Sequence, residues 1–237
     1  MESFDGCASA GCDAIELDIR YSSDNVPLAF HDETLDRTTN QTGKVELYTL
    51  AELKALDAGY RFTQDGVTYP YRGKGVVIPT LKEICENTDI DLNIDIKIHT
   101  EQAVDIFVST LRSIPGCFER VVAGSFDDKT TQYLQQIAPD IKTFGSVRET
   151  VEFTLKYYAG RPEEHIPESQ YFAVPVGYVL DNESYIKAAN NNGQGVMYWT
   201  INNLNQMERL LLDGADGIIT DDVVGAVEVF RRLGYKP

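Results

Sequence analysis

The chain has 237 residues, enough for one large α/β domain with a full hydrophobic core. Its net charge of −16 argues against a nucleic-acid partner, because binding a phosphate backbone requires an excess of Lys and Arg. An acidic chain can still act on phosphates where a bound divalent cation inverts the local field. No apolar run reaches the roughly 18 residues of a transmembrane helix, so no membrane span is expected.

The cysteines form no C-x-x-C pair and no zinc-ligand spacing. They are Cys7, Cys12, Cys85 and Cys117. We therefore expect free, mostly buried thiols. The sequence leaves the compartment open, cytoplasmic or secreted.

The N-terminal part predicts a helix followed by a hairpin. Residues 3–10 have helical spacing, and residues 13–19 and 26–30 are typical of strands. Six residues between these strands are too few for a parallel crossover, and Asp24-Asn25 favours a turn, so the strands should be antiparallel.

Residues 32–77 interrupt the regular pattern. They contain a short helical piece at 49–56 and a Gly-, Tyr- and Pro-rich stretch at 59–75. A loop this long inside a compact domain is usually functional or a small inserted subdomain, so we expect an insertion. Pro79 then suits the first turn of a helix that ends near Asn87.

After residue 90, short β-rich runs alternate with helical stretches. Strands are predicted at 92–98, 120–125, 142–145, 171–175, 195–200 and 217–220. Helices are predicted at 101–113, 128–137, 147–159, 182–191, 204–213 and 223–233. Repeated strand–helix units imply a parallel sheet, and this many imply a barrel.

The predicted fold is an α/β TIM (β/α)8-type barrel that fills one domain over residues 1–237. Counting residues 13–19, seven parallel strands are predicted, and a helix stands where the first strand–helix unit should begin. We therefore expect a barrel that lacks its first strand, with a β-hairpin and a small insertion. An open edge favours self-association, which we expect here.

Glu16 and Asp18 lie two residues apart on the first predicted strand, so both point to the same face. Two carboxylates inside a barrel are costly unless a positive charge lies between them, and a hard divalent cation is the natural candidate. A solvent-exposed pair at the rim is the alternative.

Asp95 and Lys97 repeat this arrangement, because Ile94, Ile96 and Ile98 alternate with polar residues. Asp95 is predicted to complete a three-carboxylate metal site, and Lys97 to contact a phosphate oxygen. The alternative is a buried Asp–Lys pair that satisfies itself.

His31 follows the apolar run 26–30, and a hairpin closed around Asn25 places it opposite Glu16. A histidine beside a metal site is suited to proton transfer near neutral pH. His99 and His165 are interpreted as structural or surface residues.

Phe126 and Trp199 end two later strands, at the face where barrel active sites lie. We predict that they form a wall of the substrate site. Closing the top of the barrel is the alternative role for both rings.

The stretches GCDAIELDI (residues 11–19) and PLAFHDETLDRTT (residues 27–39) resemble the glycerophosphodiester phosphodiesterase family. The resemblance continues in chain order at residues 73–81, 95–97, 125–126, 198–200 and 214–221. It implies a TIM barrel with a small insertion, here residues 32–77. It also implies a small-molecule partner, a glycerophosphodiester, which is hydrolysed to glycerol phosphate and an alcohol.

The resemblance further implies one bound Ca²⁺ or Mg²⁺ with Glu16, Asp18 and Asp95 as ligands. His31 would be one of two acid/base histidines, and Lys97 would contact the phosphate. Two features depart from the family. Asp95 stands where the family usually has Glu, and the first-strand His-Arg-Gly motif is absent. The alternative function is therefore an impaired or inert barrel that binds metal or a phosphate ester.

Overall fold

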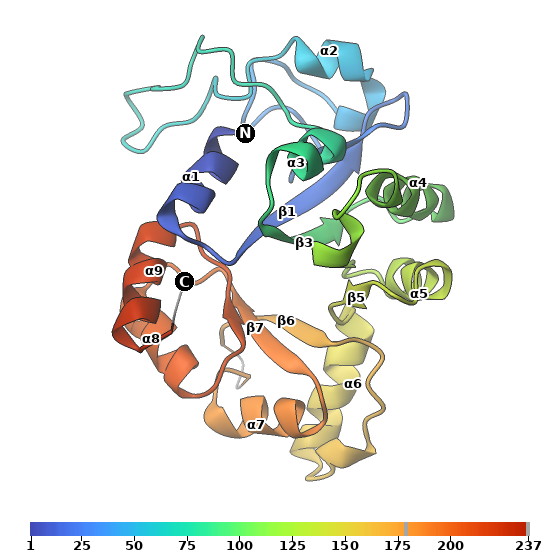
Figure 1. The fold of residues 1–237 in the computed structure, drawn as a ribbon, viewed down its shortest axis with the longest axis vertical. Helices are drawn as coiled ribbons and strands as arrows, with labels where there is room; N and C mark the ends of the chain where they lie inside the picture. Colours follow the sequence, from blue (N-terminus) through green and yellow to red (C-terminus); the bar gives the residue numbers. More distant parts are fainter. Residues whose placement is uncertain (178–179, 236–237) are drawn as a thin grey trace. The chain divides into compact units, whose positions relative to one another are not determined.

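The computed structural model describes residues 1–177 and 180–235. The chain divides into two compact units, which Figure 1 colours by sequence. Unit 1 comprises Met1–Gly6 and Ile15–Val121, and unit 2 comprises Cys7–Ala14 and Val122–Pro237. Helix α1 (Glu2–Ala10) opens the chain, in agreement with the predicted N-terminal helix.

Unit 1 is built on strands β1 (Ala14–Tyr21), β2 (Pro27–Ala29) and β3 (Asp91–Ile96), with β1 between the other two. Strands β1 and β2 pair antiparallel, with Ile19 opposite Ala29, and Asn25 takes a positive φ of 61° at the turn. The predicted hairpin is therefore confirmed. The helices of this unit are η1 (Val45–Leu47), α2 (Leu50–Lys54), α3 (Leu81–Asn87), α4 (Glu101–Arg112) and η2 (Phe118–Arg120).

The hairpin and the start of the insertion share a small buried core. It consists of Leu28, Leu35, Val45, Leu53 and Ile78. Helix α3 begins at Leu81, two residues after Pro79, so Pro79 precedes the helix and does not lie in its first turn as predicted, and Thr80 is the N-cap. The Thr80 side chain accepts a hydrogen bond from the Glu83 N–H, and the Glu83 carboxylate accepts one from the Thr80 N–H.

Unit 2 alternates strands and helices. The strands are β4 (Val121–Gly124), β5 (Lys142–Thr143), β6 (Tyr171–Pro175), β7 (Gly195–Trp199) and β8 (Gly217–Ile218). The helices are α5 (Asp128–Ile137), α6 (Val147–Tyr158), η3 (Pro162–Glu164), α7 (Glu183–Asn191), α8 (Leu204–Leu212) and α9 (Val223–Arg232). The pairs β4–β5, β6–β7 and β7–β8 are parallel. Every strand predicted after residue 90 is present.

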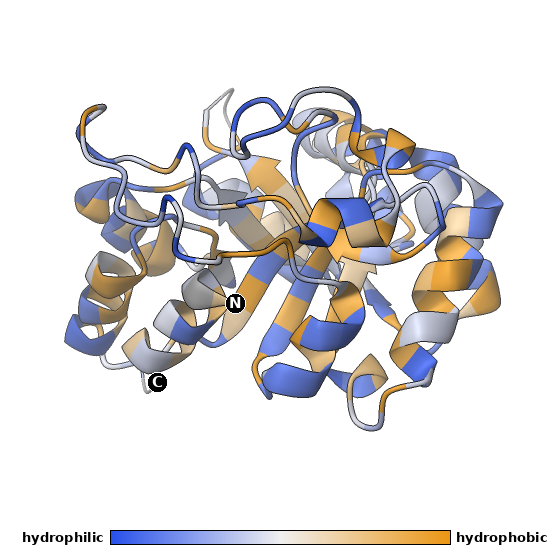
Figure 2. Ribbon diagram, turned by 90° about the horizontal axis from the view of Figure 1, so that it is seen from above, coloured by the Kyte–Doolittle hydropathy of each residue, from blue (hydrophilic) through white to orange (hydrophobic). Residues whose placement is uncertain are grey.

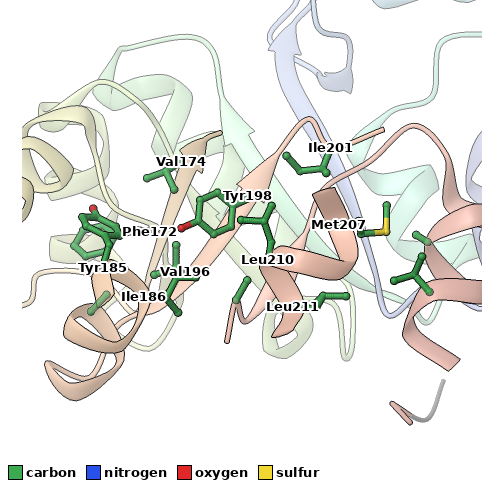
Figure 3. Packing of buried hydrophobic residues seen from close by; sticks show 14 of the residues in the cluster. Phe172, Val174, Tyr185, Ile186, Val196, Tyr198, Ile201, Met207, Leu210 and Leu211 are labelled. Carbon is green, nitrogen blue, oxygen red and sulfur yellow. The ribbon is translucent and has the colours of Figure 1, made fainter. Parts of the chain in front are cut away.

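The core of unit 2 lies between β6, β7 and the helices that follow them (Figure 3). In Figure 2, hydrophilic and hydrophobic bands alternate along the helical ribbons, as is typical of amphipathic helices. The packed side chains include Phe172, Val174, Tyr185, Ile186, Val196, Tyr198, Met207, Leu210 and Leu211. No helix in the described part of the chain combines the length and apolar character needed to cross a bilayer.

The expectation of free thiols is wrong. Cys7 and Cys12 form one disulfide at the end of α1, and Cys85 and Cys117 form a second within unit 1. The partners lie five and 32 residues apart. A search for C-x-x-C spacing cannot find such pairs, because a helix end and a tertiary contact bring them together.

Candidate functional site

Three of the predicted site residues meet in unit 1. The ammonium of Lys97 lies 2.8 Å from Asp18 Oδ1 and 2.5 Å from Asp95 Oδ2. Asp18 projects from β1, and Asp95 projects from the neighbouring β3. The apolar neighbours Ile94 and Ile96 are fully buried, as the predicted alternation requires. Two carboxylates therefore converge on one positive charge.

Burial sets the electrostatics of this cluster. The Asp95 side chain is 7% exposed, and burial raises the pKa of its carboxyl, although the hydrogen bond and charge of Lys97 oppose that rise. Burial alone would lower the pKa of Lys97, but hydrogen bonds to Asp18 and Asp95 outweigh it and raise that pKa. The lysine is therefore held in its charged form.

Two buried side-chain oxygens of β3 lack a hydrogen-bond partner among the described residues. Among the described residues, no donor reaches the buried Asp95 Oδ1, nor the buried Oδ1 of Asn93 two residues earlier. A buried acceptor without a donor is unusual and calls for an explanation. Asp18 and Asp95 already bind the Lys97 ammonium. The unpaired Oδ1 of Asp95 is an oxygen of the kind that binds a divalent metal ion.

The structure does not place the predicted metal ligands Glu16, Asp18 and Asp95 as one metal-binding group. Glu16 precedes Asp18 on β1, where Ile15, Leu17 and Ile19 are buried and Glu16 is exposed. The alternation of β1 is therefore as predicted. In residues 1–177 and 180–235, no group of three or more His, Cys, Asp or Glu side chains is placed to hold a metal ion. The three-carboxylate site thus stays a prediction.

His31 lies one residue out of the predicted register. Because Ile19 pairs with Ala29, the register continues to Leu17 opposite His31, and β2 ends before His31. The prediction that His31 faces Glu16 is therefore wrong. His31 still lies beside the site strand, since the N–H of Phe30 donates to the carbonyl of Asp18.

His31 is oriented by its sequence neighbour. Its Nδ1 lies 2.7 Å from Asp32 Oδ1, and its ring is 68% exposed. Arg37 donates to both oxygens of Asp32, at 2.6 and 2.9 Å. The Arg37 hydrogen bond is the main reason why the pKa of Asp32 falls to about 2. A carboxylate at Nδ1 leaves Nε2 available for proton transfer.

The two predicted wall residues contact each other in unit 2. The Phe126 and Trp199 rings lie 5.9 Å apart, and Phe126 also lies 6.3 Å from the Phe144 ring. Phe126 is 38% exposed. The buried Nε1 of Trp199 has no acceptor among the described residues. An aromatic pair with an unused N–H is suited to binding a polar ligand.

Three residues around His31 were not predicted from the sequence. Asp32 and Arg37 support its ring, and Arg20 donates from Nε to the His31 carbonyl at 3.1 Å. Arg20 also pairs with Glu46 at 3.0 Å. Arg20 follows Glu16 and Asp18 on the same face of β1, so the period of two could have found it.

The buried histidine of unit 2 has a structural position. His165 is 3% exposed and packs edge-on against Phe153, with ring centroids 5.5 Å apart. His99 is exposed. Both agree with the interpretation as structural or surface residues.

Comparisons with known proteins identify the family. The profile of the glycerophosphoryl diester phosphodiesterase family matches residues 1–224. A glycerophosphodiester phosphodiesterase of Caldanaerobacter subterraneus subsp. tengcongensis is 31% identical over 99% of this chain and 92% of its own.

Solved structures share the fold. The glycerophosphoryl diester phosphodiesterase domain of a Mycobacterium tuberculosis protein has a TM-score of 0.81 at 20% identity, over 96% of this chain and 91% of that one. An Oleispira antarctica phosphodiesterase, solved with the product sn-glycerol-3-phosphate, has a TM-score of 0.76 at 22% identity, over 94% and 87% of the two chains. The predicted class, a TIM-barrel-type α/β fold, is thereby confirmed. The chain is an enzyme of the glycerophosphoryl diester phosphodiesterase family.

Proposed function

We propose that this chain hydrolyses glycerophosphodiesters to glycerol phosphate and an alcohol with the help of one bound Ca²⁺ or Mg²⁺. The observation that carries the metal dependence is the convergence of Asp18 and Asp95 on one positive charge, with Asp95 Oδ1 left without a donor. The product found in the Oleispira antarctica structure supports glycerol phosphate as the product here.

Asp18, Asp95 and Glu16 would hold the cation, which supplies neutralisation of the negative charge on the phosphoryl group when bound. Lys97 adds a second positive charge. An ammonium that is held by carboxylates at 2.5 and 2.8 Å is oriented before a substrate arrives. It would contact a phosphate oxygen and stabilise the charge that develops in the transition state.

His31 would transfer the proton. Asp32 accepts at 2.7 Å from the Nδ1 side of the ring, which fixes the tautomer and leaves Nε2 as the basic nitrogen. Arg37 holds Asp32 from the other side. His31 keeps this role whether water or a hydroxyl group of the substrate attacks the phosphorus first.

Phe126 and Trp199 would contact the substrate. Their paired rings offer an apolar surface, and Trp199 Nε1 offers one hydrogen-bond donor. A glycerophosphodiester presents both apolar carbon atoms and hydroxyl oxygens, so the pair matches its chemistry.

The test is turnover of glycerophosphocholine by the full chain after EDTA treatment, with Ca²⁺ or Mg²⁺ added back. We expect activity that either cation restores, and calorimetric binding of the cation that Glu16→Gln weakens. Asp91→Asn is the matched control, because Asp91 is an exposed acid on the same strand as Asp95. Turnover that EDTA leaves intact contradicts the metal dependence. Metal binding without turnover supports the inert-barrel alternative.

A further inference from the structure

The stretch of residues 59–75, here called the insertion loop, is closed at its base. The Ala58 N–H donates to the Val76 carbonyl at 2.9 Å. A Cβ atom on Gly59 would lie 2.6 Å from Tyr71, so Gly59 permits a close approach of the two arms. Figure 1 draws this segment in teal, without helix or strand. It is a compact surface loop with adjacent ends.

Internal contacts give the loop a defined shape. The Arg72 guanidinium lies 4.3 Å from the centre of the Tyr60 ring and 3.7 Å from that of Tyr69. The rings of Phe62 and Tyr71 pack edge-on at 5.2 Å. Stacked cation–π and aromatic pairs restrain side chains that a flexible loop would leave free.

The loop exposes three apolar side chains among its polar residues. Val67 is 81% exposed, Phe62 is 46% exposed and Tyr71 is 40% exposed. Val67 follows a tight turn in which Asp65 accepts hydrogen bonds from the N–H groups of Val67 and Thr68. A side chain so far out of the protein interior gains nothing from folding. Clustered exposure of this kind marks a binding surface.

The loop is also basic in an acidic protein. It contains Arg61, Arg72 and Lys74 and one acid, Asp65, so its charge is +3 − 1 = +2, whereas the whole chain carries −16. The Asp65 carboxylate is engaged by the backbone of its own turn, which lowers its pKa. Asp65 therefore stays ionised and offsets only one of the three positive charges of the loop.

We propose that the insertion loop docks this enzyme on an anionic lipid surface. Basic residues supply the attraction to lipid phosphates, and aromatic and apolar side chains enter the headgroup region. The rest of the chain carries −16 − 2 = −18, so its summed charge opposes docking through surfaces other than the loop. The inference is independent of the proposed function, because it concerns binding and not turnover.

The test is sedimentation of the full chain with vesicles. We expect binding to equal parts phosphatidylcholine and phosphatidylglycerol, no binding to phosphatidylcholine alone, and release at high salt. Lys74→Glu changes the charge by two units, so the bound fraction should fall at least about tenfold. Val67→Ser removes the most exposed apolar side chain and should also weaken binding.

Leu155→Ser is the matched control. Leu155 is 66% exposed on α6 in unit 2, so this variant removes a similar apolar side chain outside the loop. It should bind vesicles as the parent does, and all three variants should keep the parental melting temperature and turnover of soluble glycerophosphocholine. Equal binding to both vesicle types, no binding by the parent, or parental binding by Lys74→Glu and Val67→Ser would each overturn the proposal.

Discussion

Two buried carboxylates of this protein differ in how their oxygens are satisfied. Asp95 in unit 1 meets only the Lys97 ammonium at Oδ2, and no described donor reaches its Oδ1. Glu149 in unit 2 is 1% exposed, and its Oε1 accepts from three neutral groups. These are the N–H groups of Glu168 and Ser169, at 2.8 and 3.1 Å, and Gln194 Nε2, at 2.8 Å.

The difference indicates a structural role for Glu149 and a chemical role for Asp95. Glu149 joins helix α6 to the segment before β6 and to Gln194, which precedes β7. Its Oε1 is fully engaged by hydrogen bonds within the protein, as expected of a structural carboxylate. One oxygen of Asp95 pairs with the Lys97 ammonium and the other has no described donor. This is expected of a carboxylate that binds a ligand. Substitution of the two carboxylates should therefore affect different properties.

The largest expected effect is on turnover. Asp95→Asn removes a charge that would hold the cation and Lys97, so kcat/KM for glycerophosphocholine should fall roughly a thousandfold. Lys97 keeps Asp18 as its partner, so the free energy of unfolding should fall by less than the roughly 3–5 kcal/mol that removing one partner costs a buried ion pair. A variant with parental kcat/KM would remove Asp95 from the site.

The next effect is on stability. Glu149→Ala leaves three buried donors without an acceptor, so the free energy of unfolding should fall by about 3 kcal/mol in urea titrations. Turnover per folded molecule should stay at the parental value. Glu152→Ala is the control on the same helix. Glu152 is half-exposed in ion pairs with Arg148 and Lys156, so it should cost less than about 1 kcal/mol.

His31→Gln should lower kcat by about a hundredfold and leave stability unchanged, because it removes the proton-transfer group from an exposed position. His99→Gln tests whether any nearby imidazole matters, and should keep at least half of the parental kcat. Equal losses in the two variants would contradict the role given to His31.

A smaller effect is expected at Trp199, the single tryptophan of the chain. Addition of sn-glycerol-3-phosphate should change the intrinsic tryptophan fluorescence. Trp199→Phe keeps the ring contact with Phe126 but loses the Nε1 donor, so KM should rise about fivefold with kcat unchanged. Tryptophan fluorescence that does not change at saturating sn-glycerol-3-phosphate would contradict a substrate wall formed by Phe126 and Trp199.

The smallest effect concerns pH. The pKa of Asp32 is depressed to about 2 in the folded chain, mainly by Arg37. The Arg37 contribution is therefore complete above the unfolded pKa of about 3.9 and is lost as the pH falls through about 2. The free energies of unfolding of parent and Arg37→Gln, from urea titrations, should differ by less than about 1 kcal/mol at neutral pH. The difference should shrink below pH 4 and vanish as the pH falls through about 2. A difference that persists in acid would contradict this cause.

The sequence predicted most of the strands and the face on which the site lies. Period-two alternation identified Glu16 and Asp18 on one strand and Asp95 and Lys97 on another, because buried Ile and Leu mark the opposite face. This rule needs only local information. It works wherever a strand has one apolar face.

The sequence did not predict what depends on distant or exact placement. The disulfide between Cys85 and Cys117 joins residues 32 apart, which no spacing rule anticipates. The register of His31 was wrong by one residue, because the turn centre determines it and residues 22–25 allow more than one turn. The contact of Lys97 with Asp18 crosses between strands, so only the pairing of β1 with β3 reveals it.

Because the two ends of the insertion loop are adjacent, the whole loop can be replaced by another segment. Since Ala58 and Val76 are already joined by a backbone hydrogen bond, a short glycine linker can connect them without moving the helices on either side. A loop from a relative can be grafted at the same two positions. The proposed docking surface can then be changed while the carboxylates and the lysine of the site keep their places.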